Sequence, residues 1–285
     1  ADNSIEVSVE SSDAAGNTVT STGSSTITVD TTADAGTVNI KTIADDNIIN
    51  ATEAGESTLE ISGTATGGDI TVGDVVIVTV NNNDYITSVG VGGVFSVDVD
   101  TNDLIADTSV DVSVESSDAA GNTVTSTGSA TLSLDTNADP GVVTINTIAD
   151  DDVINASESN AATIEVSGTV IGGDVLVGDE VTVNVNGTNY LTTVGALGVY
   201  SVDVNTADLI ADNTIDVSVL SSDLAGNTVT STGSATITVD TDLPTISINT
   251  ISGDNIVTDI EENSVIISGT TTEVEDGQQV TVNVA

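Results

Sequence analysis

The feature that most constrains the fold of this chain is an internal repeat. The segment DAAGNTVTSTGS begins at Asp13 and again at Asp118, and DLAGNTVTSTGS begins at Asp223, so each copy starts 105 residues after the previous one. Solenoid units usually span about 20–50 residues, so this period is too long for a solenoid. It fits one independent domain of about 100 residues.

The repeat predicts the domain organisation. Residues 31–135 and 136–240 form two complete domains, residues 1–30 are the C-terminal part of a repeat, and residues 241–285 are the N-terminal part of another. Neither end piece carries enough strands to bury a core by itself. We therefore expect the native molecule to be longer at both ends.

Within one repeat, apolar and polar residues alternate with the period of a β-strand. In residues 109–115, for example, Val110, Val112 and Val114 face one way while the polar residues between them face the other. This pattern predicts strands at 37–43, 57–66, 75–81, 84–89, 94–100, 109–116 and 123–134, with one helical turn at 102–106. Seven short strands joined by Gly- and Asn-rich turns indicate an all-β, immunoglobulin-like sandwich, repeated in tandem.

The few aromatic residues also recur at the repeat period. Tyr85 and Phe95 return as Tyr190 and Tyr200, and we expect all four to fill the core. The chain has no Cys and no Trp, so it lacks the disulfide and the core Trp of an antibody-type domain.

The charge balance excludes several functions. One Lys or Arg stands against 45 Asp and Glu, which gives a net charge of −44. Such a chain cannot neutralise nucleic-acid phosphates or bind an anionic membrane surface. It has no His and no Cys for nucleophilic or acid–base catalysis, and aromatic residues, which usually wall a sugar-binding cleft, make up 1% of it. We expect it not to be an enzyme, and we expect it to attract cations.

The strand order predicts where the acidic loops lie. If each strand runs opposite to the one before it, loops 44–56, 81–84 and 100–108 lie at the C-terminal end of a domain, and loops 67–74, 90–93 and 118–122 lie at the N-terminal end. Where repeats follow one another, acidic groups from one domain, the linker and the next domain then converge. Two carboxylates at 4 Å repel each other by roughly 4 kcal/mol at an effective dielectric constant of about 20, so bound cations would stabilise such a junction.

The chemistry of these groups favours Ca²⁺, which takes six to eight oxygen ligands, and a softer metal would use His or Cys. The segment from Asp45 to Glu53 is the strongest candidate, because clustered Asp residues followed by Glu let a short loop surround one ion. Other interpretations are a solvated acidic turn at Asp45, an Asx-turn at Asp118 and a helix cap at Asp103. The predicted metal-binding residues are Asp13, Asn17, Asp30, Asp34, Asp45, Asp46, Glu53, Asp69, Asp74, Asp100, Asp103, Asp118, Asn122, Asp135, Asp139, Asp150, Asp151, Glu158, Asp174, Asp179, Asp223, Asn227, Asp240, Asp242, Asp254 and Glu261.

Three segments carry a resemblance to a known family. The strings TIADDNIIN from Thr42, SGT from Ser62 and DAAGNT from Asp118 resemble the tandem immunoglobulin-like extender repeats of giant bacterial RTX adhesins, which are secreted by the type I route. The resemblance covers effectively the whole chain. It implies an extracellular stalk on the cell surface, made rigid by several Ca²⁺ ions per repeat, that holds a ligand-binding tip away from the cell.

The linkers also look like those of this family, and the resemblance places the junction role on Asp135, Asp139 and Asp240. The third linker departs from the pattern, because it is two residues shorter, contains Pro244 and is followed by Gly253 where Asp45 and Asp150 stand in the other repeats.

We therefore expect a mechanical function in which neighbouring repeats of the same chain are the partners, nucleic acid is not bound and the membrane is not entered. Two alternatives remain open. The repeats could bind a glycan, ice or a partner protein directly. Ice binding would favour a flat, regular array of Thr, and Thr123, Thr125 and Thr127 alternate, but on a single strand and as ordinary β-propensity also predicts. The chain could also be a subunit of an extracellular filament or surface layer whose strand edges pair with another copy.

Overall fold

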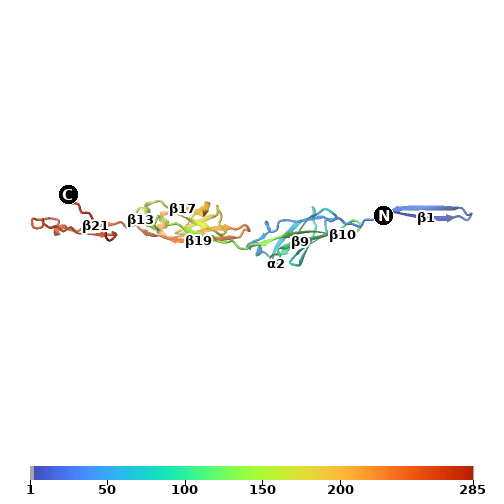
Figure 1. Ribbon diagram of the computed structural model, residues 1–285, viewed down its shortest axis with the longest axis horizontal. Coiled ribbons are helices and arrows are strands. Elements are labelled where there is room, and N and C mark those ends of the chain that lie inside the picture. The colour runs from blue at the N-terminus through green and yellow to red at the C-terminus, as the bar shows by residue number, and fades with distance from the viewer. Residues whose placement is uncertain (1–2, 285) are drawn as a thin grey trace. The chain divides into compact units, whose positions relative to one another are not determined.

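The computed structural model describes residues 3–284. The chain divides into two compact units, Ala1–Asn137 with Leu224–Asn227, and Ala138–Asp223 with Thr228–Ala285. Each unit contains one complete two-layer β-sandwich (Figure 1). The predicted boundaries at 31–135 and 136–240 stay a prediction.

The sandwich of the first unit has a sheet of three strands and a sheet of four. The smaller sheet has the order β3–β5–β8 and consists of Thr37–Ile40, Thr58–Thr66 and Val94–Asp100. The larger sheet has the order β10–β9–β6–β7 and consists of Thr123–Thr131, Ser109–Ser117, Val75–Val80 and Asn83–Ser88. All neighbouring strands in both sheets are antiparallel, as the immunoglobulin-like fold requires.

The sandwich of the second unit repeats this topology. Its smaller sheet, β12–β14–β17, consists of Val142–Ile145, Thr163–Ile171 and Val199–Asn205. Its larger sheet, β16–β15–β18–β19, consists of Thr188–Thr193, Glu180–Val185, Thr214–Ser222 and Thr228–Thr236. The 105-residue sequence repeat is thus a repeat of one fold.

The cores follow from the alternation of residues along each strand. In β9, Val110, Val112 and Val114 are fully buried, as predicted, and in β6 Val76 and Val78 are buried opposite them. Fully burying one Val side chain contributes roughly 1.5–3 kcal/mol relative to leaving it exposed. One such cluster fills each sandwich, so each has its own core.

The aromatic residues fall into two classes, which corrects one prediction. Phe95 and Tyr200 are buried in the cores, as expected. Tyr85 and Tyr190 are only partly buried and pack at the edge of the cores, because their hydroxyl groups bind carboxylates at the domain surface. Their function is therefore partly polar.

Short strand pairs close each sandwich. The strand pattern does not predict a strand at 48–49, whereas residues 133–134 lie within the strand predicted at 123–134. Strand β4 (Ile48–Ile49) pairs in parallel with β11 (Ser133–Leu134), and β13 (Val153–Asn155) pairs in parallel with β20 (Thr238–Asp240). Helix α1 (Ala51–Ala54) follows β4, and the 3₁₀ turn η1 (Glu158–Asn160) follows β13. These pairs fasten the loop after the first strand to the segment that leaves the domain.

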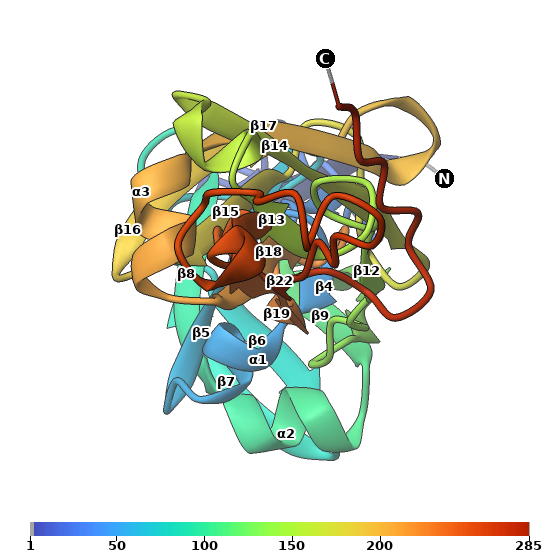
Figure 2. The ribbon, with the colours of Figure 1, turned by 90° about the vertical axis from the view of Figure 1, so that its left-hand side faces the viewer.

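Helical turns also follow the last strand of each smaller sheet. Helix α2 (Thr101–Ala106) matches the predicted turn, and α3 (Thr206–Ala211) is its counterpart. Within the first unit α1 contacts α2, and Figure 2 shows the two helices near each other, with α2 below α1. The 3₁₀ turns η2 (Ala196–Gly198) and η3 (Ile251–Gly253) complete the helical elements of the described residues.

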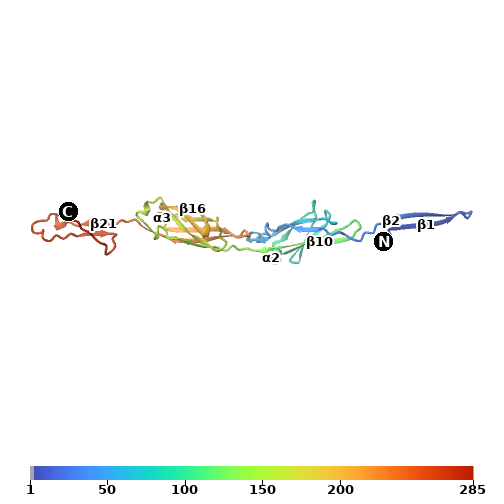
Figure 3. The same ribbon diagram turned by 45° about the horizontal axis from the view of Figure 1, so that its top comes forward.

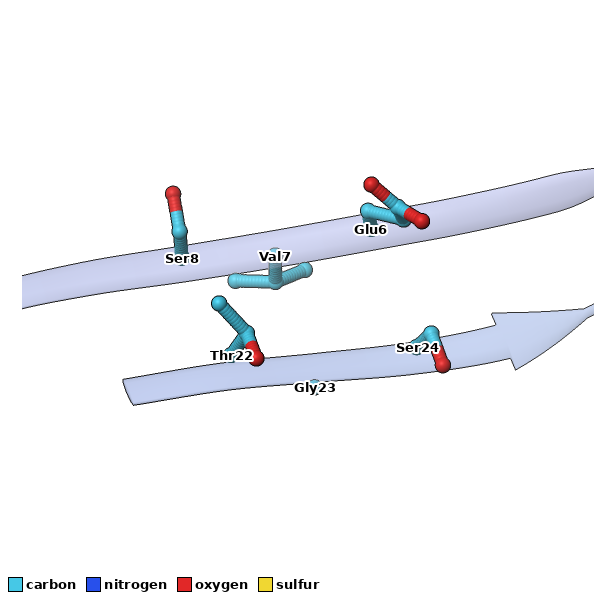
Figure 4. A pocket seen from close by; sticks show the side chains of 6 residues that line it. All are labelled: Glu6, Val7, Ser8, Thr22, Gly23 and Ser24. Atoms are coloured by element: carbon cyan, nitrogen blue, oxygen red, sulfur yellow. The ribbon is translucent and has the colours of Figure 1, made fainter. Parts of the chain in front are cut away.

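The two ends of the chain contain partial repeats. Strands β1 (Ser4–Ser12) and β2 (Thr18–Thr26) form a hairpin with the register of β9 and β10 (Figure 3). Its apolar residues are exposed, and Figure 4 shows Val7, which is 59% exposed, opposite Gly23. At the other end, β21 (Thr245–Ile248) pairs with β22 (Gly269–Thr272). None of the described helices is long and apolar enough to span a membrane.

Candidate calcium-binding loops

A reciprocal pair of hydrogen bonds fastens the linker to the first sandwich. The backbone N–H of Asp34 donates to Asp69 Oδ2 at 2.6 Å, and the N–H of Asp69 donates to the Asp34 carbonyl at 2.9 Å. Gly68 permits this approach, because its φ is +55° and a Cβ there would lie 2.3 Å from the Asp34 carbonyl oxygen. The second unit has the same pair between Asp139 and Asp174. The structure therefore brings two predicted acidic residues of the linker and the Gly-Gly-Asp loop together in each unit.

The DAAGN segments form Asx-turns. Asp118 Oδ1 accepts from the N–H groups of Ala120 and Asn122 at 2.9 and 2.8 Å, and Asp118 Oδ2 accepts from Asn122 Nδ2 at 2.7 Å. These bonds, led by the Asn122 side chain, lower the pKa of Asp118 from its usual value. Asp13 and Asn17 make the same three bonds, which lower the pKa of Asp13. Each turn is complete from hydrogen bonds alone, and Asn122 Nδ2 also donates to the Asp30 carbonyl at 3.3 Å.

The loop from Asp45 to Glu53 is built around a capping box. Asn50 caps α1 by accepting from the N–H groups of Thr52 and Glu53, and Glu53 Oε2 accepts from the Asn50 N–H at 3.0 Å. Asp46 Oδ1 accepts from the Ile48 N–H at 2.8 Å. Asp45 has a left-handed φ of +64°, and its side chain makes no hydrogen bond within the described residues.

The corresponding loops of the other repeats keep this design. In the second, Asp151 accepts from Val153, Asn155 and Glu158 form the same reciprocal bonds, and Asp150 again has positive φ. In the third, Asp254 accepts from Ile256, and Glu261 accepts from both the N–H and the hydroxyl of Thr258, which lowers the pKa of Glu261. Asn50 and Thr258 are each followed three residues later by a Glu, which is the spacing of a capping box. This signal is present in the sequence, and the prediction of metal ligands does not take it into account.

Asp103 lies in a different environment. Its carboxylate accepts from the Tyr85 hydroxyl, from Asn83 Nδ2 at 2.8 Å and from Asn81 Nδ2 at 3.0 Å. The Tyr85 bond, followed by the Asn81 and Asn83 bonds, lowers the pKa of Asp103. Burial and the Asp103 bond raise the pKa of Tyr85. This network joins α2 to the β6–β7 hairpin, and Tyr190, Asn186 and Asp208 repeat it in the second unit.

The remaining predicted residues make local backbone bonds or lie next to them. Asp100 caps α2 through the Asn102 N–H, and Asp74 and Asp179 close turns by accepting from Thr71 and Leu176. Asp223 directly precedes the segment Leu224–Asn227, and Asp242 donates its N–H to Asp240. Asp30, Asp135 and Asp240 each accept, through Oδ1, the N–H two residues further on, at 3.2, 3.3 and 3.1 Å.

The residues present fit Ca²⁺ in chemistry. Every candidate donor is a carboxylate, amide or carbonyl oxygen, and within the described residues the side chains of Asp34 and Asp45 make no hydrogen bonds that would compete with a metal. Among residues 3–284, however, no three carboxylates come together as a ready-made metal group. Hydrogen bonds hold these loops in place, and among the described residues their carboxylates are not arranged around a common point as they would be around a bound Ca²⁺ ion.

The threonine row considered for direct ligand binding is confined to one strand. Thr125 and Thr127 of β10 are exposed, but their partners on β9 are Glu115 and Ser113. The next residues across the sheet are Val75 and Ile77. The outer face of this described sheet therefore carries a mixed surface and no flat Thr array.

Comparisons with known proteins give a consistent result. No protein-family model and no curated protein sequence matches the chain. Among solved structures, a Ca²⁺-stabilised adhesin that helps an Antarctic bacterium reach out and bind ice is 53% identical, with a TM-score of 0.73, over 95% of this chain and 66% of that one. A structure of a 1.5-MDa bacterial ice-binding adhesin is 44% identical, with a TM-score of 0.77, over 85% of this chain and 76% of that one. The chain belongs to the immunoglobulin-like extender repeats of bacterial RTX adhesins.

A third match, a bacterial immunoglobulin-like domain from the M. primoryensis ice-binding adhesin, is 53% identical over 36% of this chain and all of that one, with a TM-score of 0.35. These relatives are structural parts of adhesins and act at the cell surface. The chain of extender repeats spans 66% of the first relative's length.

Proposed function

We propose that this chain is a Ca²⁺-stiffened segment of an adhesin stalk that projects a ligand-binding tip from the cell. The observation that carries the proposal is the 44% identity to an ice-binding adhesin, of which this chain covers 76%. One of the related adhesins is described as stabilised by Ca²⁺. The role is mechanical and includes no catalytic step.

The charge of the chain explains why such a stalk needs cations. A net charge of −44 leaves the acidic loops without basic partners, so their mutual repulsion favours separated repeats. Ca²⁺ supplies positive charge and binds six to eight oxygens. The residues that would hold it are the acidic residues of the linker and the loops that hydrogen bonds fasten to it, Asp30, Asp34, Asp69 and Asp118, and their counterparts 105 residues later.

The loop from Asp45 to Glu53 is the second proposed position. Ala44, Asp45 and Asn47 all have positive φ, and Ala149, Asp150 and Asp152 repeat this conformation. Left-handed non-Gly residues cost free energy and are found where function or the surrounding structure requires them. Their recurrence in both repeats supports a specific role for this loop, and the carboxylate of Asp45 is available for it.

Thermal unfolding of the chain tests the proposal. Because a bound ion stabilises only the folded state, Ca²⁺ at 100 times its dissociation constant contributes about 2.7 kcal/mol per site. We expect the melting temperature to rise with millimolar Ca²⁺, to rise less with Mg²⁺, which prefers smaller octahedral sites, and to fall in chelator. Equal melting temperatures in Ca²⁺ and chelator would contradict the proposal.

A further inference from the structure

One hairpin turn of the second repeat carries a chemically distinctive pair of residues. Asn186 is followed by Gly187, and this is the one Asn-Gly pair in the sequence. The two residues form the complete loop of the β15–β16 hairpin, because Val185 pairs with Thr188. Both have positive φ, +53° and +73°, as in the two-residue turns that Asn-Gly favours, and both are exposed.

An Asn-Gly pair can lose the side-chain amide of the Asn. The backbone nitrogen of the next residue attacks the side-chain carbon Cγ, and a bond between these atoms replaces the Cγ–Nδ2 bond, which closes a succinimide ring. The proton of the attacking nitrogen leaves with the amide nitrogen as ammonia, and water then opens the ring to give aspartate or isoaspartate. A Gly after the Asn favours the attack, because it has no side chain to shield its nitrogen and its backbone is the least restricted.

The equivalent turn of the first repeat has a different second residue. Asn81 and Asn82 form the loop of the β6–β7 hairpin, with φ of +49° and +60°. Asn81 Nδ2 donates to Asp103 Oδ1 at 3.0 Å, just as Asn186 Nδ2 donates to Asp208 Oδ1 at 3.0 Å. The two turns therefore share their backbone conformation and their side-chain partner, and they differ in the residue that follows the Asn.

The amide of Asn186 helps to hold α3 on the hairpin. Asp208 of α3 accepts from the Tyr190 hydroxyl and from Asn186 Nδ2, and these bonds, led by that of Tyr190, lower the pKa of Asp208. Loss of the amide nitrogen removes one donor and places a second carboxylate opposite Asp208, where like charges repel. Isoaspartate also adds a carbon to the backbone of a turn whose length fixes the register of the hairpin.

We propose that Asn186 is a modification site, at which the side-chain amide is lost through a succinimide formed with Gly187 and the attachment of the β15–β16 hairpin to α3 is weakened. The overall reaction consumes water and releases ammonia, and it needs no enzyme, metal or other reagent. It alters the second repeat and spares the equivalent turn of the first. The site lies within the second sandwich and does not depend on the Ca²⁺ sites of the proposed function.

Mass spectrometry of the full chain tests the site directly. The folded protein is incubated in mildly alkaline buffer and then digested with pepsin at low pH, and the gain of one dalton on loss of an amide is assigned to a residue. We expect Asn186 to lose its amide roughly tenfold faster than Asn81, because Gly follows only Asn186. Equal rates at the two residues, or an Asn186 that stays unmodified, would overturn the proposal.

Reciprocal substitutions in the two turns provide matched controls. Gly187→Asn recreates the turn of the first repeat, and it fits because a Cβ at this position would have no neighbour within 4 Å and Asn82 already adopts φ +60° in the equivalent place. Asn82→Gly recreates the turn of the second repeat. Loss of the amide should become slow at Asn186 in the first variant and fast at Asn81 in the second. A rate that stays with the position, whichever residue follows, would contradict the assigned chemistry.

Thermal unfolding tests the structural consequence. Asn186→Asp reproduces the aspartate product, and Asp tolerates positive φ as Asn does, so the turn is retained. The variant should melt at a lower temperature than the wild type at neutral pH. Wild-type protein aged until Asn186 is modified should show at least the same decrease. If Asn186→Asp melts at the wild-type temperature, the amide does not hold α3 and the second part of the proposal is wrong.

Discussion

At the scale of single residues, the acidic side chains differ in what they bind. Asp103 is surrounded by three donors, and its carboxylate is used in holding α2 to the β6–β7 hairpin. Asp118 accepts three hydrogen bonds within its own turn, two through Oδ1 and one through Oδ2, which leaves acceptor capacity on Oδ2. Asp34 and Asp45 make no side-chain hydrogen bond within residues 3–284, so no donor in that range occupies their carboxylate oxygens. Composition alone cannot separate these groups, because it counts all of them as negative charge.

The Asp103 network predicts a pH-dependent effect of Tyr85→Phe. The variant loses the hydroxyl that chiefly lowers the pKa of Asp103, and we expect a lower melting temperature at neutral pH. Because the folded-state pKa lies below the usual value of 3.8, the stabilisation is fully present above about pH 4 and is lost as the pH falls through the folded-state pKa. Melting curves of wild type and variant should therefore converge at low pH. A constant difference down to about pH 2 would show that the hydroxyl acts in another way.

Two glycines in the same sequence motif, Gly128 and Gly23, test how closely the two sheets of the first sandwich pack. A Cβ at Gly128 of β10 would lie 2.7 Å from the Val38 carbonyl of β3, whereas a Cβ at Gly23, in the same TSTGS sequence, would have no neighbour within 4 Å. Gly128→Ala should destabilise the first sandwich by roughly 1–3 kcal/mol, the usual cost of overpacking. Chemical denaturation measures this, with Gly23→Ala as the control. Equal effects of the two substitutions would mean that the sheets separate easily.

At the scale of elements, the loop that carries α1 combines two functions that depend on the same residue. Glu53 closes the capping box and is also a candidate ligand of Ca²⁺. A Gln side chain can close the box equally well, because the box needs only an oxygen acceptor. The two functions are therefore separable by substitution.

Glu53→Gln should keep the stability of the chelator-treated protein and weaken the stabilisation by Ca²⁺. Glu53→Ala should lose both, with a cost of about 1 kcal/mol in chelator for the missing hydrogen bond. Titration of the melting temperature with Ca²⁺ measures the two effects. If Glu53→Gln responds to Ca²⁺ as the wild type does, Glu53 is only a cap.

The strands could be predicted from the sequence because their cause is local. The alternation of Val110, Val112 and Val114 determines which face of β9 is buried. The parallel pair β4–β11 could not be predicted, because Ile48 and Ser133 are far apart in the chain and two-residue strands carry no periodic signal. The hydrogen-bond network of Asp103 could not be predicted for a similar reason, since its three donors come from Asn81, Asn83 and Tyr85, and only the folded chain brings them together.

At the scale of the whole molecule, the sequence repeat produces the same domain structure more than once. The two complete sandwiches share topology, register, linker bonds and the capping loop, with counterparts 105 residues apart. The relatives identified by structure are adhesins. A stalk of such repeats is stiff only if the joints are stiff, and in the proposed function Ca²⁺ at the acidic loops supplies that stiffness.

Distance measurement between two spin labels tests the stiffening by Ca²⁺ most directly. The chain contains no Cys, so Ser129→Cys and Ser234→Cys give unique labels at exposed, equivalent positions of β10 and β19. With millimolar Ca²⁺ the distribution of distances between the labels should be narrow, and in chelator it should broaden. Distributions of equal width in the two conditions would contradict the account.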